Sequence, residues 1–389
     1  MSILRNLFVA TLALCAAAPP LPAAEPLVIG LPLSQTGNLA DSAEHVRKGL
    51  TLWLEQVNVA GGILGRPVEL KTYDDKSDPG TAVRLTERLI TSDKVDLLIS
   101  PFGSSATIAA SAVNEKHRRV AMNVSGASQQ IHQRGFRYIV QVVAPSNEYV
   151  AGIFPVAARA GHKTIAYIAR DYTGARDVEA AVRALAAQHG MTIVMLEYFP
   201  AGTTDFSSHI TRARDLKPDV WISIGYPNEA IEMIRQMRAG NYAPKMFVSN
   251  GVSQEDFITA TGRDGDYAFG ISLYEPGQKT KGNEAFVRDF RARWGYEPGY
   301  YAAMGWAAAA VLREAVEKAG TIDQEKIRGS LLELRTETPF GPFAVDATGA
   351  QVAKKAMIIQ VRNGRREIVW PFELQTMAPV LPMPTWAER

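Results

Sequence analysis

Three short apolar segments decide the fold: LVIGLP at 27–32, VELKTY at 68–73 and VDLLIS at 95–100. Helical patterns separate them, the first an amphipathic stretch over about 41–60 and the second over 81–92. Strands written as nearly continuous apolar runs, alternating with helices, are typical of a parallel sheet that has helices on both faces. This part of the chain therefore predicts a doubly wound α/β unit.

The same alternation of apolar strands and amphipathic helices begins again after Pro145. No repeat at a fixed period and no low-complexity tract interrupts it, so the sequence predicts a second doubly wound unit of the same class. We expect strands at 164–169, 192–198 and 220–224, with helices at 177–189 and 207–216 between them. Two later helices, expected at 283–294 and 302–318, close the fold without starting a third domain.

The first 24 residues have the layout of a secretory signal peptide. Arg5 precedes an apolar run over 7–18, and small residues follow up to Ala24. The run is about a dozen residues, shorter than the roughly twenty that a membrane-spanning helix needs. A lipoprotein start at Cys15 is the alternative, but Leu14 before it is bulkier than such signals usually carry. We expect export to the periplasm and removal of residues 1–24.

The composition indicates a soluble two-domain protein once the signal peptide is removed. The chain has 389 residues, 47% of them hydrophobic, and a formal net charge of +2. Its one cysteine lies in the predicted signal peptide, so stability must come from a packed core instead of disulfides. Basic and acidic residues are interspersed with no basic stripe, which excludes a nucleic-acid-binding surface.

In an open α/β sheet, ligands bind beyond the carboxyl ends of the strands, so the loops after strands are the places to search. The loop after the third segment places the Ser104 and Ser105 hydroxyls and free amide groups at a helix N-terminus, which favours an anion. Simple N-capping is the alternative. A second loop, Ser125 to Ser128, follows the expected strand at 120–124 and would otherwise be an ordinary turn.

Several further segments carry a family resemblance. They are LSQTG at 33–37, NVAGGILGRP at 58–67, YDDKSDP at 73–79, GTTDF at 202–206, GYPNE at 225–229, FGPF at 340–343 and DATG at 346–349. Their order resembles the periplasmic Leu/Ile/Val-binding proteins and their amino-acid and amide-binding relatives, across nearly the whole chain. The resemblance implies a type I periplasmic binding fold, with two lobes that close on a ligand in the cleft between them.

The resemblance also implies that the lobes are discontinuous in sequence. Three chain crossings are expected, near Pro145, near Tyr274 to Pro276 and near Lys355. One lobe would then comprise residues 25–145 plus 276–355, and the other residues 146–275 plus 356–389.

By the same resemblance, a ligand carboxylate binds to Ser104, assisted by backbone groups around Ser105, Ser125 and Ala127. Aromatic contacts are expected from Tyr172, Tyr226 and Tyr301, and core packing is the alternative for each of them.

Three departures from the family pattern bear on the ligand, and one of them is Ser42, which stands where a Tyr contact is expected. Asn250 stands where the amino-acid binders carry a Glu that pairs with the α-ammonium group, and Ala127 stands where they carry a Thr. A buried ammonium needs a carboxylate or several acceptors. We therefore favour slightly a carboxylic acid without an α-amine, aromatic or aliphatic, over an amino acid. For the amino acid, Ser128 could replace the Thr, and the missing charge could come from Glu229, Asp205 or Glu275.

The function expected is that of a non-catalytic, monomeric solute-binding protein that delivers its ligand to the permease and ATPase subunits of an ABC importer. A sensor that feeds a separate receptor is the alternative. No dinucleotide fingerprint, phosphate loop or hydrolase elbow is present, and the six histidines show no metal-ligand spacing, so we expect no catalytic residues, cofactor or metal. The acidic cluster Asp74, Asp75 and Asp78 is interpreted as a capping loop.

Overall fold

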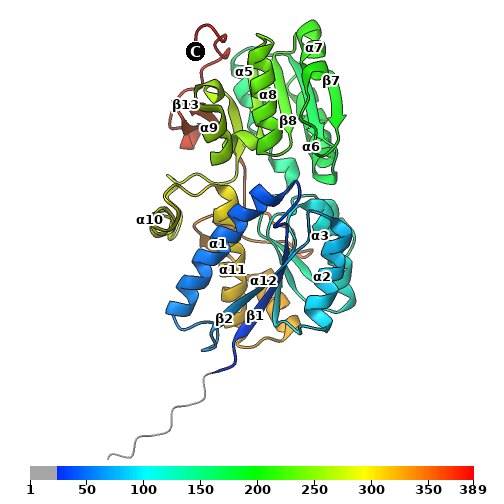
Figure 1. The fold of residues 1–389 in the computed structure, drawn as a ribbon, viewed down its shortest axis with the longest axis vertical. Coiled ribbons are helices and arrows are strands. Elements are labelled where there is room, and N and C mark those ends of the chain that lie inside the picture. The colour runs from blue at the N-terminus through cyan, green and yellow to red at the C-terminus, as the bar shows by residue number, and fades with distance from the viewer. Residues whose placement is uncertain (1–23) are drawn as a thin grey trace, which may run out of the picture.

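Residues 24–389 are described in this computed structural model, and they build two α/β lobes stacked along the long axis (Figure 1). Each lobe has its own sheet, of five strands in what we call the N-terminal lobe and seven in the C-terminal lobe. The predicted signal peptide lies outside the described residues, apart from Ala24. Within residues 24–389, no helix combines the length and apolar character that crossing a membrane requires.

The sheet of the N-terminal lobe is parallel, with the strand order β2-β1-β3-β4-β5. This is a doubly wound order in which the strand sequence reverses between β1 and β3, and a crevice opens at such a switch point. The strands are β1 (Leu27–Leu33), β2 (Val68–Asp74), β3 (Leu97–Ile99), β4 (Ala121–Asn123) and β5 (Ile139–Gln141). The helices are α1 (Ala40–Val59), α2 (Pro79–Thr91), α3 (Ser104–Lys116), α4 (Gln130–Gln133), α10 (Asn283–Trp294), α11 (Tyr300–Ala319) and α12 (Gln324–Glu333).

The C-terminal lobe repeats this order in the parallel part of its sheet, as β7-β6-β8-β9-β10. Its switch point lies between β6 and β8. The strands are β6 (Thr164–Arg170), β7 (Thr192–Phe199), β8 (Val220–Ile224), β9 (Met246–Ser249) and β10 (Phe269–Ser272). The helices are α5 (Ile153–Arg159), α6 (Thr173–Gln188), α7 (Ser207–Leu216), α8 (Pro227–Ala239) and α9 (Glu255–Thr261).

An antiparallel hairpin extends the second sheet beyond β10, which the sequence analysis does not predict. It consists of β13 (Met357–Arg362) and β14 (Arg365–Trp370). The turn is Asn363-Gly364, and both residues have positive φ, at 52° and 70°. Asn-Gly is a strong hairpin signal because both central residues of that turn need positive φ. A second short hairpin, β11 (Thr336–Thr338) with β12 (Gly341–Phe343), lies in the segment after α12.

The chain passes between the two sheets three times, after β5, after β10 and before β13. An ion pair joins the first and third connections, with Lys355 Nζ 2.9 Å from Glu148 Oε2. We keep the lobe boundaries as a proposal: residues 25–145 plus 276–355, and residues 146–275 plus 356–389.

Two glycines allow the long helices α1 and α11 of the N-terminal lobe to pack backbone against backbone. A Cβ on Gly49 of α1 would lie 1.9 Å from the Ala302 carbonyl oxygen, and one on Gly305 of α11 would lie 2.4 Å from the Val46 carbonyl oxygen. Contacts this short cannot be relieved by side-chain rotation, since both partners are backbone atoms. The helix pair therefore depends on the absence of side chains at these two positions.

Gly49→Ala is expected to lower the free energy of unfolding by about 3 kcal/mol, because overpacking at a rigid contact forces the helices apart. Gly329→Ala in α12 is the matched control, since a Cβ added there would meet nothing within 4 Å. It should change stability by less than about 1 kcal/mol, in the stabilising direction. Urea unfolding followed by circular dichroism measures both, and equal stability of the two variants would contradict the close-packing account.

Candidate functional site

The two switch points face each other across a cleft between the lobes. An inner cavity of about 40 Å³ is lined by residues that follow β3 and β4 in one lobe and β6, β8 and β9 in the other, together with the start of α11. Seven of the eight predicted site residues line it: Ser104, Ser125, Ala127, Tyr172, Tyr226, Asn250 and Tyr301. The predicted positions, which are widely scattered in the sequence, therefore meet at one place.

An outer cavity of about 210 Å³ adjoins the inner one. The two share the lining residues Phe102, Gly103, Ser104, Tyr172 and Tyr226, so they are neighbouring parts of one cleft. The eighth predicted residue, Ser105, lines the outer cavity only.

The hydroxyl of Ser104 is preset as a hydrogen-bond donor. Its Oγ accepts hydrogen bonds from the amide N–H groups of Ala127 and Ser128, each at 3.2 Å. A serine oxygen has two acceptor positions. Because both are occupied, what Ser104 has left to offer a ligand is its O–H proton, and an acceptor such as a carboxylate is its natural partner. The Ala127 amide, expected to face the ligand, binds Ser104 instead.

Helix α3 adds further donors at the same place. Its first intrahelical bond runs from Thr107 N–H to Gly103 C=O, so the amide groups of Ser104, Ser105 and Ala106 precede the hydrogen-bonded ladder. Gly103 turns the chain into the helix at φ +84°, a conformation that favours glycine, and its amide donates to Ser125 Oγ at 2.9 Å. The positive end of the helix dipole and the Ser104 proton thus point to the same small region.

Asn250 lines the inner cavity, but its side-chain amide holds two loops together. Its Oδ1 accepts from the Gly225 amide at 3.0 Å, and its Nδ2 donates to the Gly225 carbonyl at 2.7 Å. A glutamate could accept from Gly225 but could not donate to it. Asn250 therefore joins the turn after β8 to the end of β9 and brings no negative charge.

The three acidic residues that might have supplied that charge bind elsewhere, and none lines either cavity. Glu229 accepts from the Tyr226 amide at 2.6 Å and contacts Arg170, and burial raises the pKa of its carboxyl against the pull of Arg170. Glu275 pairs with Arg366 at 2.9 Å. Asp205 is exposed and accepts from the Ser207 amide. The residues that line the inner cavity include no acidic and no basic side chain.

Ser128, the possible replacement for the family's threonine, lines neither cavity. It donates to Asp177 Oδ2 of α6 at 2.6 Å, and the same oxygen accepts from the Gln129 amide at 2.9 Å. These bonds run between the lobes, as does the contact of His45 Nε2 with Asp256 Oδ2 at 3.0 Å. The structure therefore describes the lobes closed on each other.

Aromatic rings form much of the cleft wall. The Phe102 ring lies 5.4 Å from Tyr301 and 6.3 Å from Tyr226, and Tyr226 lies 6.1 Å from Tyr172. Burial raises the pKa of the Tyr226 hydroxyl to about 12, so it stays protonated at neutral pH. The family pattern does not identify two further lining residues, Tyr149 and Tyr300. The repeat Tyr300-Tyr301 at a helix start is the one sequence signal that could have indicated the second.

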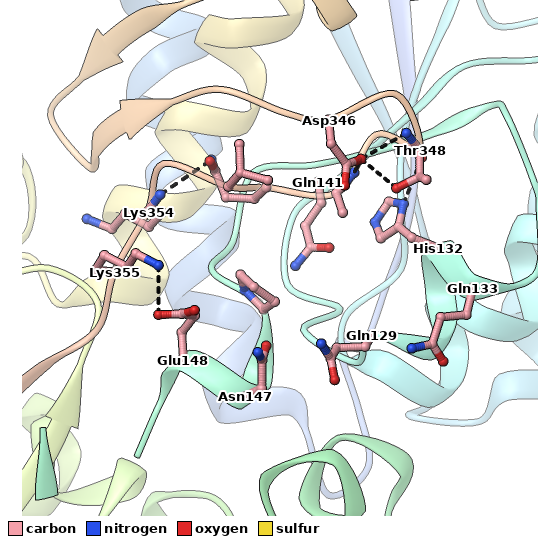
Figure 2. Close-up of a pocket in the computed structure, with 14 residues that line it drawn as sticks. Gln129, His132, Gln133, Gln141, Asn147, Glu148, Asp346, Thr348, Lys354 and Lys355 are labelled. Atoms are coloured by element: carbon pink, nitrogen blue, oxygen red, sulfur yellow. Dashed lines mark hydrogen bonds and ion pairs between the residues drawn. The ribbon is translucent and has the colours of Figure 1, made fainter. Parts of the chain in front are cut away.

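A larger cavity, of about 490 Å³, lies beside the first and third connections between the lobes, which we call the hinge, and not in the cleft. In Figure 2 the side chains of Gln141 and Asn147 point toward each other across it, with the Lys355–Glu148 ion pair at its edge. It contains none of the predicted site residues. Its lining mixes amide side chains with charged ones, and both of its lysines are engaged, Lys354 by the Phe340 carbonyl and Lys355 by Glu148. It contains no phenylalanine, tyrosine or tryptophan, so we assign the site to the cleft.

The acidic loop after β2 serves as a local scaffold. Asp74 accepts from the amides of Gln35 and Thr36, and Asp78 caps α2 through the Thr81 amide. Among the residues the structure describes, no group of three or more metal-ligating side chains forms a candidate metal site.

One buried lysine beside the hinge predicts a pH effect on stability. Lys354 is 4% exposed and donates to the Phe340 carbonyl, and burial lowers the pKa of its ammonium to about 7. Below pH 7 both folded and unfolded chains hold this proton, and the cost of burying the charge is fully present. Between pH 7 and about 10 only the unfolded chain holds it, so stability rises with pH.

Lys354→Met should remove this rise. The free energy of unfolding of wild type relative to Lys354→Met is expected to increase from pH 6.5 to pH 10, by up to about 1.4 kcal/mol per unit within that window. Lys279→Met, at an exposed position, is the control and should show a constant difference. Urea unfolding at four pH values measures these differences, and a difference between wild type and Lys354→Met that stays constant with pH would contradict the buried-charge account.

Comparison with known proteins identifies the family and the fold. A leucine-, isoleucine-, valine-, threonine- and alanine-binding protein from Pseudomonas aeruginosa is 27% identical over 329 residues, which cover 84% of this chain and 87% of that protein. A leucine-binding protein from Thermotoga maritima superimposes with a TM-score of 0.81 at 22% identity, covering 88% of this chain and 97% of the other. A solute-binding protein from R. palustris in complex with benzoate gives a TM-score of 0.82 at 21% identity, covering 92% and 98%. The periplasmic binding protein family model matches residues 26–366, and the chain belongs to that family.

Proposed function

We propose that this protein is the periplasmic solute-binding component of an ABC importer and that it captures a small carboxylic acid without an α-amine, preferably an aromatic one. The observation that carries the proposal is the pairing of a preset donor at Ser104 with an inner cavity that has no acidic lining residue.

The carboxylate would bind at the start of α3. The Ser104 hydroxyl and the free amides of the first helical turn would donate to its oxygens, and charge-assisted hydrogen bonds of this kind are shorter and stronger than neutral ones. The helix dipole favours a negative charge at the same end.

An α-ammonium group would meet no such compensation. Moving it from water into the closed cleft costs several kcal/mol unless a carboxylate faces it. Glu229, the acidic residue that follows Tyr226 in the C-terminal lobe, is already used by the Tyr226 amide and by Arg170. An aromatic ring, by contrast, matches the walls formed by Phe102, Tyr172 and Tyr226.

The relatives include binders of both ligand classes. The Pseudomonas aeruginosa protein is named for branched-chain and small amino acids, and R. palustris proteins of the same fold are seen with benzoate and with 4-hydroxybenzoate. The charges of this chain's own cleft favour the second class.

Capture would work by lobe closure. The Ser104 end of the ligand contacts the N-terminal lobe and the tyrosine walls belong largely to the C-terminal lobe, so a bound ligand favours the closed arrangement through contacts with both. The closed monomer would then be presented to the permease and ATPase subunits. We propose export through the signal peptide at residues 1–24 and no catalytic step.

Calorimetric titration with benzoate, 4-hydroxybenzoate, leucine and phenylalanine tests the proposal. We expect micromolar binding of at least one of the two acids, and binding of the amino acids that is at least tenfold weaker. Ser104→Ala should weaken acid binding about tenfold or more, through loss of one charge-assisted hydrogen bond. Ser111→Ala is the matched control, since Ser111 lies on the same helix but lines neither cavity, and its hydroxyl bonds only to the Ile108 carbonyl and Arg134. Micromolar binding of the amino acids with no response to the acids would refute the proposal.

A further inference from the structure

Arg170, at the end of β6, is a buried cation whose hydrogen-bonding capacity is largely unused. It is 7% exposed and lines the outer cavity. A guanidinium carries five N–H donors. The one hydrogen bond found for it within residues 24–389 is from Nη1 to Glu229 Oε1, at 3.4 Å. The guanidinium carbon Cζ of Arg170 also lies 4.9 Å from the centroid of the Tyr226 ring.

Glu229 is an incomplete partner for this cation. Its second oxygen, Oε2, accepts from the Tyr226 amide at 2.6 Å and completes the N-terminal cap of α8. Only Oε1 of Glu229 contacts the guanidinium, so the pair lacks the two parallel hydrogen bonds by which a guanidinium usually binds an acid. Burying a guanidinium with one long contact is costly, and a further anion would offset that cost.

The outer cavity offers room for such an anion. Its volume is about 210 Å³, and across from Arg170 it is bordered by the Ser104-Ser105 start of α3. The other ionisable side chain in its lining that carries charge at neutral pH is Asp171, which pairs with Arg176 at 2.8 Å. The uncompensated charge that faces this space is thus positive.

We propose that the outer cavity is a second anion subsite and that the solute of this protein is a dicarboxylate. The inference rests on the proposed function and narrows its ligand class. One carboxylate binds at Ser104 in the N-terminal lobe, and the other binds to Arg170 in the C-terminal lobe. The body of the solute lies along Phe102 and Tyr226, which line both cavities. Each end then contacts a different lobe, so the second charge also strengthens closure.

Titration of the wild-type protein with benzoate and with benzene-1,2-, benzene-1,3- and benzene-1,4-dicarboxylate is the first test. The two carboxylates of the three diacids lie at different separations, so the diacid that binds most tightly indicates the separation between the Ser104 and Arg170 subsites. We expect at least one of them to bind about tenfold or more tightly than benzoate, because a charged hydrogen-bonded contact is added. Benzoate binding as tight as that of every diacid would overturn the subsite while leaving the proposed function in place. Failure of benzoate and all three diacids to bind would contradict both.

The second test assigns the preference to Arg170. Arg170→Gln should bring the ratio of benzoate to diacid dissociation constants close to one. Arg170→Lys keeps the charge but loses the planar guanidinium with its paired N–H donors, so it should retain part of the preference for the diacid. Glu229→Gln is the matched control, since it alters the same pair yet leaves the cation, and it should keep the preference. An unchanged ratio in Arg170→Gln would overturn the assignment. If that variant fails to fold, the wild-type comparison and Arg170→Lys still decide.

Discussion

The amide groups of Ala127 and Ser128 both donate to the hydroxyl oxygen of Ser104, and the chemistry of the cleft depends on this arrangement. It joins the loop after β3 to the loop after β4, so neither loop can shift without the other. It also fixes the direction of the one remaining proton, which makes Ser104 a donor. An acceptor with negative charge is the partner that gains most from a fixed donor at the start of a helix.

The rest of the cleft would surround the anion that we propose. The C-terminal lobe brings tyrosine rings and Arg170 to the opposite face, while Asn250 is occupied by the Gly225 backbone and adds no charge. The two lobes present matching switch points, so the residues after β3 and β6 meet although they are far apart in sequence. Closure then follows from contacts that one ligand makes with both faces, and bonds such as Ser128 to Asp177 add to it.

Local patterns predicted most of the fold, because a buried strand and an amphipathic helix are each written in a few consecutive residues. The strand expected at 27–32 is found at Leu27–Leu33, and the helix expected at 207–216 has those bounds. The hairpin β13–β14 was missed although its Asn-Gly turn signals it. Tyr149 and Arg170 could not be identified, since their position in the cleft depends on how two distant lobes meet. Asn250 lines the inner cavity, but its pairing with Gly225 is a tertiary contact that sequence does not reveal.

The central claim is that the cleft binds a carboxylate and that its inner cavity has no acidic side chain to face an α-ammonium group. The most direct test is a matched pair of ligands that differ by that group alone, phenylalanine and 3-phenylpropionate, titrated calorimetrically against the same protein. The account predicts that 3-phenylpropionate binds at least tenfold more tightly, because no carboxylate offsets the desolvation of the amine. Tighter binding of phenylalanine would contradict it.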